Sequence, residues 1–326
     1  MNKLVYFYTP GGELVNRLLT EAGFEIVNGN GTVDHELLAK CDALVPGKGV
    51  FRRDLLEEAK NLKIISKFGV GMDRIDIDAC TELGIWACNT PLVNYVAVSE
   101  HTAALLLAAA KRFLPVVSRV HREEPDWFGA HKFTSIELMG KTLALIGFGH
   151  IGQRVARLFS TFEMNIVAYD PFADDSAFPD YVTRVHTLDE AAACADFVSV
   201  HAAGEKSTEH LIDAHFLSLM KPTAILINTT RGFVVDEEAL IKALQEKRIA
   251  GAALDVFNTE PVTGRNELMC MENVITTPHC AANTPEARLR SQRDAAANII
   301  ACFNGERPPF ALNNPIGVSK SDKSDE

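Results

Sequence analysis

Three glycines in the middle of the chain have the spacing of a phosphate-binding turn. Gly147, Gly149 and Gly152 form a G-x-G-x-x-G sequence that follows an apolar run and precedes an amphipathic helical pattern. In such a turn the first glycine permits the tight bend, the second lets the backbone approach a pyrophosphate, and the third allows helix and strand to pack closely. The N-terminus of the helix attracts the anion. The sequence therefore predicts a dinucleotide site at this turn.

A carboxylate follows the next predicted strand, where a dinucleotide site needs one. Asp170 stands 23 residues after Gly147. At this place a carboxylate accepts hydrogen bonds from both ribose hydroxyls of NAD, whereas it would repel the additional phosphate of NADP. No Arg or Lys occurs in residues 171–175, so the sequence favours NAD. The alternative interpretation is a glycine turn beside an unrelated surface acid.

Several other polar residues follow predicted strands, and ligands bind at the carboxyl ends of strands in an open parallel sheet. The guanidinium of Arg231 is a planar fork suited to a carboxylate. The imidazole of His279 can move a proton near neutral pH, and a carboxylate such as Glu260 would orient it. A surface Arg, a structural His and a surface acid remain the alternatives. His201 is expected to line the adenosine side.

These residue types fit the reduction of a carbonyl group. Hydride addition builds negative charge on the carbonyl oxygen, so the reaction needs a cation and a proton donor there. A nicotinamide supplies the hydride. This chemistry requires no metal, and the seven cysteines contain no C-x-x-C pair, so neither a zinc site nor a disulfide framework is predicted.

Short apolar runs alternate with helical patterns along most of the chain, which predicts an α/β protein with parallel sheets. We expect two doubly wound domains, with a larger Rossmann NAD-binding domain (99–287) inserted in a smaller substrate-binding domain (1–98 and 288–326). The expected strands are 4–8, 43–45, 62–66, 142–146, 165–169, 197–200, 224–228, 251–254 and 274–276. The expected helices are 13–22, 54–61, 151–162, 208–219, 237–246 and 285–303.

Three further segments carry expectations of their own. Residues 99–121 are rich in Ala and Leu on most sides, which predicts one long helix buried against another domain or subunit. Residues 122–139 lack a clear period and are interpreted as an arm that packs on a partner. Residues 313–326 are rich in Ser, Lys and Asp and are predicted to be disordered.

Composition excludes several classes of protein. The chain has 326 residues, of which 47% are apolar and 23% charged, as in globular proteins. A formal net charge of −11 argues against nucleic-acid binding. The longest small or apolar run, 103–110, is too short to span a bilayer. The first ten residues are predicted to form a strand and turn, with no signal peptide. A reducing cytoplasm fits the odd number of cysteines best.

Taken together, these motifs resemble the D-isomer-specific 2-hydroxyacid dehydrogenase family, which includes D-3-phosphoglycerate dehydrogenases. The resemblance runs from about residue 45 to residue 314. Besides the glycine turn, it rests on the segments Gly69-Val70-Gly71-Met72-Asp73, Glu100-His101-Thr102, Tyr169-Asp170-Pro171, Asn228-Thr229-Thr230-Arg231-Gly232, Ala253-Leu254-Asp255-Val256-Phe257, Glu260-Pro261 and Pro278-His279.

The resemblance implies a catalytic triad of Arg231, Glu260 and His279. Arg231 would hold the carboxylate and keto oxygen of a 2-oxo acid. His279 would give a proton to that oxygen while NADH delivers hydride to C2, and Glu260 would support the imidazolium. These roles imply reversible NAD-dependent oxidation of a D-2-hydroxy acid.

The resemblance also implies residues that bind the substrate and the cofactor. The backbone amides of Val70 and Gly71 would bind the substrate carboxylate, and Asp255 would bind the nicotinamide carboxamide. Family members are usually dimers joined through the nucleotide domain, so a homodimer is expected. Besides Asp255, the glycines and Asp170, the expected cofactor site comprises Thr102, His150, Ile151, His201, Thr229, Thr230, His279 and Ala281.

One loop departs from the family pattern. Residues 46–53 carry Lys48, Arg52 and Arg53, whereas many family members have a small polar residue in place of Lys48. We hypothesise that Lys48 or Arg52 meets a second anionic group on the substrate, such as a phosphate, a sulfonate or a distal carboxylate. Solvated charge beside a helix is the alternative.

Other functions found in this family are weighed against the dehydrogenase. An NADH-sensing corepressor of the C-terminal-binding type has the same fold and triad, and it is kept as the alternative. A phosphite dehydrogenase would have a Lys where Val70 stands. A formate dehydrogenase would need a longer N-terminal region and a Gln in place of Glu260.

Overall fold

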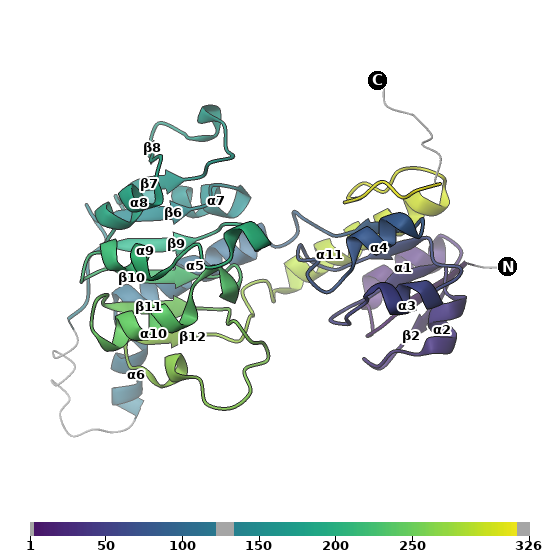
Figure 1. Cartoon of the computed structure of the whole chain (residues 1–326), viewed down its shortest axis with the longest axis horizontal. Coiled ribbons are helices and arrows are strands. Elements are labelled where there is room, and N and C mark those ends of the chain that lie inside the picture. The colour runs from purple at the N-terminus through teal and green to yellow at the C-terminus, as the bar shows by residue number, and fades with distance from the viewer. Residues whose placement is uncertain (1–2, 122–133, 318–326) are drawn as a thin grey trace. The chain divides into compact units, whose positions relative to one another are not determined.

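The computed structural model describes residues 3–121 and 134–317 and divides the chain into two compact units. Unit 1 consists of Met1–Asn94 and Thr284–Glu326, and unit 2 of Tyr95–Asn283. Each unit is built on a parallel β-sheet with helices on both faces, which confirms the predicted α/β fold of two parallel-sheet domains (Figure 1).

Unit 1 contains a five-stranded sheet with the order β2-β1-β3-β4-β5, in which every neighbouring pair is parallel. The order changes direction between β1 and β3, and ligands bind at the carboxyl ends of strands at such a switch point. The strands are β1 (Lys3–Phe7), β2 (Phe24–Asn28), β3 (Ala43–Val45), β4 (Ile64–Ser66) and β5 (Trp86–Cys88). The helices are α1 (Glu13–Glu21), α2 (His35–Lys40), α3 (Arg53–Glu58), α4 (Ile77–Glu82) and α11 (Pro285–Phe303).

The sheet of unit 1 separates two apolar clusters. Along β1, Tyr6 faces α2, α3 and α4, while Val5 and Phe7 face α1 and α11. Successive side chains of a strand point to opposite faces, so a strand with both faces covered is apolar throughout. Helix α11 is distant in sequence, yet it contributes Ala296 and Ile299 to the second cluster.

Unit 2 contains a seven-stranded parallel sheet with the order β12-β11-β10-β9-β6-β7-β8. This is the doubly wound arrangement of dinucleotide-binding proteins, with its switch point between β6 and β9. The strands are β6 (Thr142–Ile146), β7 (Asn165–Tyr169), β8 (Val182–Arg184), β9 (Phe197–Val200), β10 (Ile225–Asn228), β11 (Gly251–Leu254) and β12 (Val274–Thr276). The helices are α5 (Tyr95–Ala110), α6 (Phe113–His121), α7 (His150–Ser160), α8 (Leu188–Cys194), α9 (Ala214–Leu219) and α10 (Glu237–Gln245).

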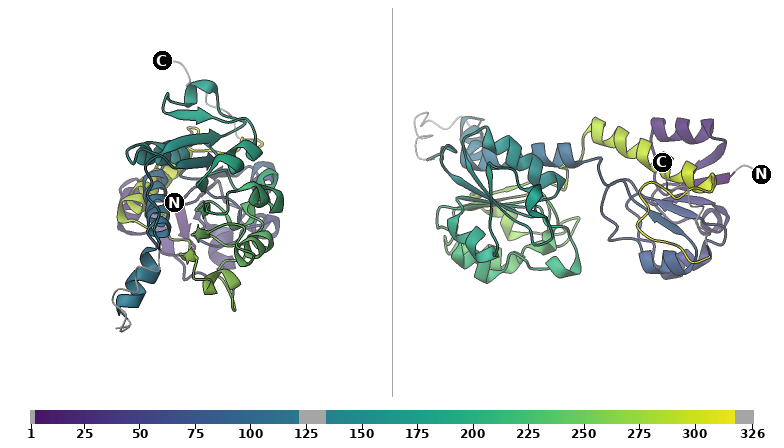
Figure 2. Two further views of the ribbon diagram at one scale, coloured as in Figure 1. Left: turned by 90° about the vertical axis from the view of Figure 1, so that its left-hand side faces the viewer. Right: turned by 90° about the horizontal axis from the view of Figure 1, so that it is seen from above.

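The two faces of this sheet are covered by different sets of helices (Figure 2). Helices α5 and α7 pack on one face and α8, α9 and α10 on the other. The side chains of β6 alternate between the two faces. Leu143 and Leu145 belong to the apolar cluster with α5 and α7, while Ala144 and Ile146 belong to the cluster with α8, α9 and α10. Burial on both sides makes the strands rigid supports for the loops at their carboxyl ends.

Some elements differ from the prediction. The long helix expected over 99–121 is interrupted, because Arg112 adopts a left-handed backbone conformation with φ of 50° between α5 and α6. Asn313, which was expected to begin a disordered tail, is instead ordered, since its side chain is buried and accepts a hydrogen bond from the amide of Ala87. Of the predicted arm, residues 122–133 lie outside the described residues, as do residues 318–326 of the tail.

The described helices include none that is both long enough and apolar enough to cross a membrane.

Candidate active site

The glycine turn has the geometry that its sequence predicts. Gly147 has a φ of 96°, and a Cβ there would lie 2.6 Å from the amide nitrogen of Ala202. A Cβ at Gly152 would lie 2.4 Å from the carbonyl oxygen of Gly147, so helix α7 and the turn pack closely. At Gly149, which precedes the first residue of α7, a Cβ would meet nothing within 4 Å. The space beside Gly149 suits a pyrophosphate at a helix N-terminus.

Asp170 lies at the end of β7 and faces this turn. Its Oδ2 accepts a hydrogen bond of 2.8 Å from the amide of Phe148, and its Oδ1 accepts one from the amide of Phe172. A carboxylate oxygen can accept more than one hydrogen bond, so these contacts orient the group and leave lone pairs for ribose hydroxyls.

A cation near Asp170 was not considered in the sequence analysis, because it comes from β8. Arg184 donates to the carbonyl oxygen of Asp170 at 3.2 Å and forms an ion pair with Asp175. Its guanidinium also lies 4.9 Å from the ring centroid of Phe178. Side-chain pairing between neighbouring strands could have revealed this cation, whereas a search limited to residues 171–175 could not.

His201 follows β9 and is held as a neutral imidazole. Burial lowers its pKa to about 3. Its Nε2 lies 2.9 Å from the hydroxyl of Ser199, while Nδ1 is buried and has no partner in the described part of the chain. A buried ring nitrogen without a partner is costly, and a polar group of a bound cofactor would relieve that cost.

His279 and Glu260 form a close pair in the candidate site. The Nδ1 of His279 lies 2.5 Å from Oε2 of Glu260, and the other oxygen of Glu260 accepts a hydrogen bond from the amide of Phe257. The His279 backbone has a φ of 50°. Its imidazole is half exposed. The arrangement orients the ring through Nδ1.

Asp255 holds the turn that carries His279. Its carboxylate is fully buried and accepts hydrogen bonds from the hydroxyl of Thr277 and the amides of Cys280 and Ala281. Its carbonyl oxygen accepts one from the amide of His279. Burial raises the pKa of the Asp255 carboxyl, but hydrogen bonds from His101, Thr277 and the two amides outweigh burial and bring the pKa to about 2. The group is therefore an anion that shapes the backbone around His279.

Two glycines fix the position of Arg231. A Cβ at Gly204 would lie 2.2 Å from Cγ of Arg231, so this loop residue leaves room for the arginine stem. A Cβ at Gly232 would lie 2.0 Å from the carbonyl carbon of Phe257. The segment carrying Arg231 therefore packs on the segment whose Phe257 amide binds Glu260. The guanidinium also donates to the carbonyl oxygen of Thr230.

The remaining residues expected at the cofactor differ in their exposure. Thr102 is fully buried, where it donates to the carbonyl oxygen of Val98 and pairs with the hydroxyl of Thr229. Thr230 donates to the carbonyl oxygen of Ala202. His150 is exposed at the start of α7, followed by the partly exposed Ile151, whereas Ala281 is buried.

In unit 1, the loop after β4 is shaped to present backbone amides. The Gly69 amide donates to the hydroxyls of Thr90 and Ser291. The carbonyl oxygen of Val70 accepts a hydrogen bond from the side chain of Asn89. Within the described chain, the amides of Val70 and Gly71 have no acceptor. Two such amides on an exposed loop suit an anion.

The Lys48 loop follows β3, at the switch point of the unit 1 sheet. Its backbone is fixed, because Arg74 donates to the carbonyl oxygen of Lys48. Arg52 donates to the carbonyl oxygen of Asp73, while Arg53 forms an ion pair with Glu82. Lys48 itself is exposed.

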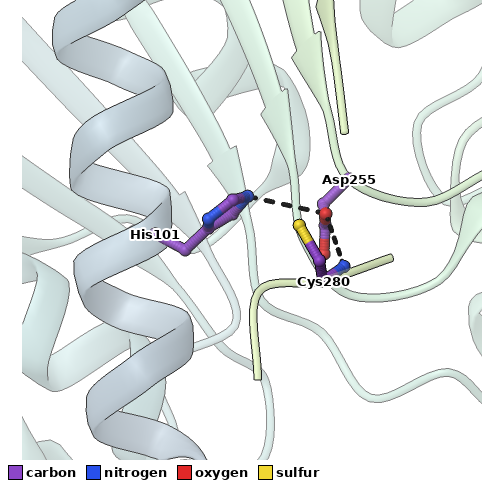
Figure 3. A group of neighbouring side chains, drawn as sticks. All are labelled: His101, Asp255 and Cys280. Carbon is purple, nitrogen blue, oxygen red and sulfur yellow. Dashed lines mark hydrogen bonds and ion pairs between the residues drawn. The ribbon is translucent and has the colours of Figure 1, made fainter. Parts of the chain in front are cut away.

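A further group near Asp255 was missed by the sequence analysis. His101 of α5 and Cys280 after β12 both point toward Asp255 (Figure 3). The Nε2 of His101 lies 3.1 Å from the hydroxyl of Thr277. His101 occurs in one of the family-like segments, but neither the residue types nor the spacing indicate that it meets residues so distant in sequence.

Comparison with known proteins gives a consistent result. The model of the D-isomer specific 2-hydroxyacid dehydrogenase NAD binding domain matches residues 103–281. A glyoxylate reductase of Thermofilum pendens is 41% identical over 268 residues, which cover 81% of this chain and 78% of that protein. A D-3-phosphoglycerate dehydrogenase of Methanocaldococcus jannaschii is 39% identical over 304 residues, or 92% of this chain, but the chain spans only 57% of that relative.

A solved structure agrees with these relatives. The D-lactate dehydrogenase of Aquifex aeolicus, complexed with NAD and lactic acid, has a TM-score of 0.85 and 28% sequence identity. The similarity covers 96% of this chain and 100% of that one. An NADPH-dependent glyoxylate/hydroxypyruvate reductase of Sinorhizobium meliloti also has a TM-score of 0.85, with 27% identity and coverage of 95% and 98%.

Replacing Asp170 tests its assignment to the cofactor ribose. Asp170→Ala should weaken NADH binding and relax the preference for NADH over NADPH, because a ribose acceptor and a charge that repels phosphate are both lost. Fluorescence titration with the two nucleotides measures the ratio of affinities. Asp174→Ala removes a nearby exposed carboxylate and should leave that ratio unchanged. An unchanged ratio in Asp170→Ala would refute the ribose role.

Proposed function

This chain belongs to the D-isomer-specific 2-hydroxyacid dehydrogenase family, and on that premise we propose that it interconverts a 2-oxo acid and the corresponding D-2-hydroxy acid. It is an NAD-dependent oxidoreductase that acts on the CH–OH group of its donor. Bound at the glycine turn, NAD supplies or accepts the hydride. The observation that carries the finer proposal is the hydrogen bond between His279 and Glu260, beside the segment that holds Arg231.

In this proposal His279 is the acid and base of the reaction. Its Nδ1 faces Glu260 at 2.5 Å, so Nε2 is the atom that gives a proton to the forming hydroxyl or takes it back. The Glu260 carboxylate stabilises the imidazolium and keeps the ring turned toward the substrate. Asp255 acts through the backbone, since it holds the turn on which His279 stands. A contact between Asp255 and the nicotinamide carboxamide remains part of the proposal.

The substrate carboxylate is assigned to the guanidinium of Arg231. A guanidinium binds a carboxylate through two parallel hydrogen bonds and adds positive charge near the carbonyl oxygen. Val70 and Gly71 are supported as carboxylate-binding residues by their amides, which lack an acceptor in the described chain.

Lys48 is proposed to select substrates with a second anionic group. Support comes from its place at the switch point of the unit 1 sheet, where ligands of such folds bind. Arg52 is the second candidate for this contact. The identity of the second group, whether phosphate, sulfonate or carboxylate, is to be read from substrate preference.

We also propose a homodimer and a cytoplasmic location. Three apolar residues of α6, Phe113, Leu114 and Val120, are about half exposed, which suits a surface covered by a second copy. All seven cysteines are free thiols, as in proteins of reducing compartments.

A panel of 2-oxo acids followed by the absorbance of NADH tests the function directly. The dehydrogenase predicts steady turnover with at least one of them. Tight NADH binding without turnover on any acid would instead favour the alternative, an NADH-sensing corepressor.

Replacing His279 tests the proton-transfer role. His279→Ala should bind NADH normally and lose roughly 10²–10⁴-fold in turnover, because general acid catalysis is worth that much. Steady-state assays measure the loss of turnover, and titration with NADH measures the affinity for the nucleotide separately. His215→Ala is the matched control, since that imidazole is exposed and pairs only with the exposed Asp189. A larger loss of NADH affinity than of rate would show that the role is misassigned.

Adding one methyl group at Gly204 tests the position of Arg231. Gly204→Ala should displace the arginine stem and lower kcat/KM for the oxo acid about tenfold or more, since hydrogen bonds to charged groups contribute about 1.5–3 kcal/mol. NADH affinity should not change. Ala203→Gly alters the same loop without adding an atom and serves as the control. An unchanged kcat/KM for the oxo acid in Gly204→Ala would contradict the assignment of Arg231.

Replacing Lys48 tests the choice of substrate. Lys48→Ala should lower kcat/KM for doubly anionic oxo acids about two- to fivefold relative to apolar ones, the size expected for a partly exposed ion pair. Lys60→Ala, another exposed lysine of unit 1, should change neither. If the ranking of anionic and apolar oxo acids stays the same, Lys48 does not contact the substrate.

A further inference from the structure

Three side chains of unit 2 that are far apart in sequence bring metal-ligating atoms together. His101 comes from α5, Asp255 follows β11 and Cys280 follows β12 (Figure 3). One imidazole nitrogen, one carboxylate oxygen and one sulfur lie within 4.8 Å of one another. No other group of three such residues meets this condition among the residues that the structure describes.

The spacing is close to that of a tetrahedral zinc site. With Zn–N and Zn–O bonds of about 2.0–2.1 Å, two ligands of such a site lie about 3.4 Å apart. The Nε2 of His101 and Oδ1 of Asp255 are 3.5 Å apart. In such a site the sulfur lies about 3.6 Å from each of them, and here all three atoms lie within 4.8 Å of one another.

A fourth possible ligand atom, a hydroxyl oxygen, lies beside these three. The hydroxyl of Thr277 lies 2.6 Å from Oδ1 of Asp255 and 3.1 Å from Nε2 of His101. In the hydrogen-bonded state this hydroxyl donates to Asp255 and accepts from His101. A cation among the same atoms would accept lone pairs from the nitrogen, the carboxylate and the sulfur, with the hydroxyl or a water in the fourth position.

The chemistry of the ligands selects the kind of ion. A thiolate and an imidazole favour zinc and similar thiophilic ions over magnesium or calcium. Asp255 contributes a negative charge that the protein has already desolvated, since the side chain is fully buried. The thiol of Cys280 would lose its proton to solvent as the metal–sulfur bond forms, so that site and ion together are close to neutral.

We propose that His101, Asp255 and Cys280 form a binding site for a thiophilic divalent cation of the zinc class. Occupation of the site would inhibit the enzyme. The expected inhibition rests on the proposed function, in which His279 transfers the proton. Cys280 directly follows His279 in the turn after β12, and Asp255 accepts hydrogen bonds from the amides of both residues. An ion drawing on the Asp255 carboxylate would rearrange that turn and compete with NADH.

Direct binding tests the site without relying on activity. Full-length protein, freed of metal by a chelator and kept reduced, is titrated with Zn²⁺ alone by calorimetry, and Cd²⁺ is used to detect the ultraviolet absorption of a metal–thiolate bond. One ion per chain and a thiolate band are expected. Cys280→Ser and His101→Asn should each weaken binding at least about tenfold, since even loss of an outer-shell partner costs 10–100-fold. Cys270→Ser removes an exposed cysteine outside the cluster and should bind as the wild type does.

The outcomes separate the metal site from the proposed function. Equal affinity in wild type and Cys280→Ser, or no thiolate band, would overturn the site and leave the cluster as a hydrogen-bonded support for the His279 turn. His101→Asn provides the same comparison if the serine variant fails to fold. In activity assays, inhibition by Zn²⁺ should be competitive with NADH and reversed by a chelator. Binding at the cluster without inhibition would support the site and overturn its link to the cofactor.

Discussion

A carboxylate that is buried in a protein must gather hydrogen-bond donors, and Asp255 obtains them from the turn that follows β12. Two amides and a hydroxyl of that turn bind its side chain, and its own carbonyl oxygen binds the amide of His279. Their combined effect outweighs burial and keeps the group ionised. The hydrogen bonds that stabilise the buried Asp255 carboxylate thus also fix the position of His279. In that position His279 contacts Glu260, and the proposed proton transfer depends on this contact.

The core of this fold was predictable because its strands are buried on both faces. Such strands are continuous apolar runs, and β6, β7, β9, β11 and β12 have the limits that the sequence indicated. Elements such as β8, with three residues, and α8, with seven, are too short to show a clear period. The interruption at Arg112 was missed because the apolar pattern continues across it, while only the backbone changes direction.

The motifs of the candidate site could be predicted from the sequence, whereas the residues that position those motifs were harder to predict. The glycine turn, Asp170 and the strand-end residues carry their chemistry in local sequence. In contrast, Gly204 gives no local sign that its missing side chain accommodates Arg231. Arg184 and His101 reach the site from other elements, and such meetings depend on sheet order and helix packing rather than on spacing. The supports of a site are therefore harder to infer than its reacting groups.

Helix α11 gives the chain an order of assembly during synthesis. It completes the second cluster of unit 1, although the whole of unit 2 is translated between it and the first 94 residues. At about 5–20 residues per second, the ribosome needs roughly 10–40 s to make the intervening segment. Throughout that interval this face of the first sheet is covered by α1 but lacks α11. The second unit can therefore finish folding before the first, and the nascent chain presents an apolar surface of the kind that chaperones bind.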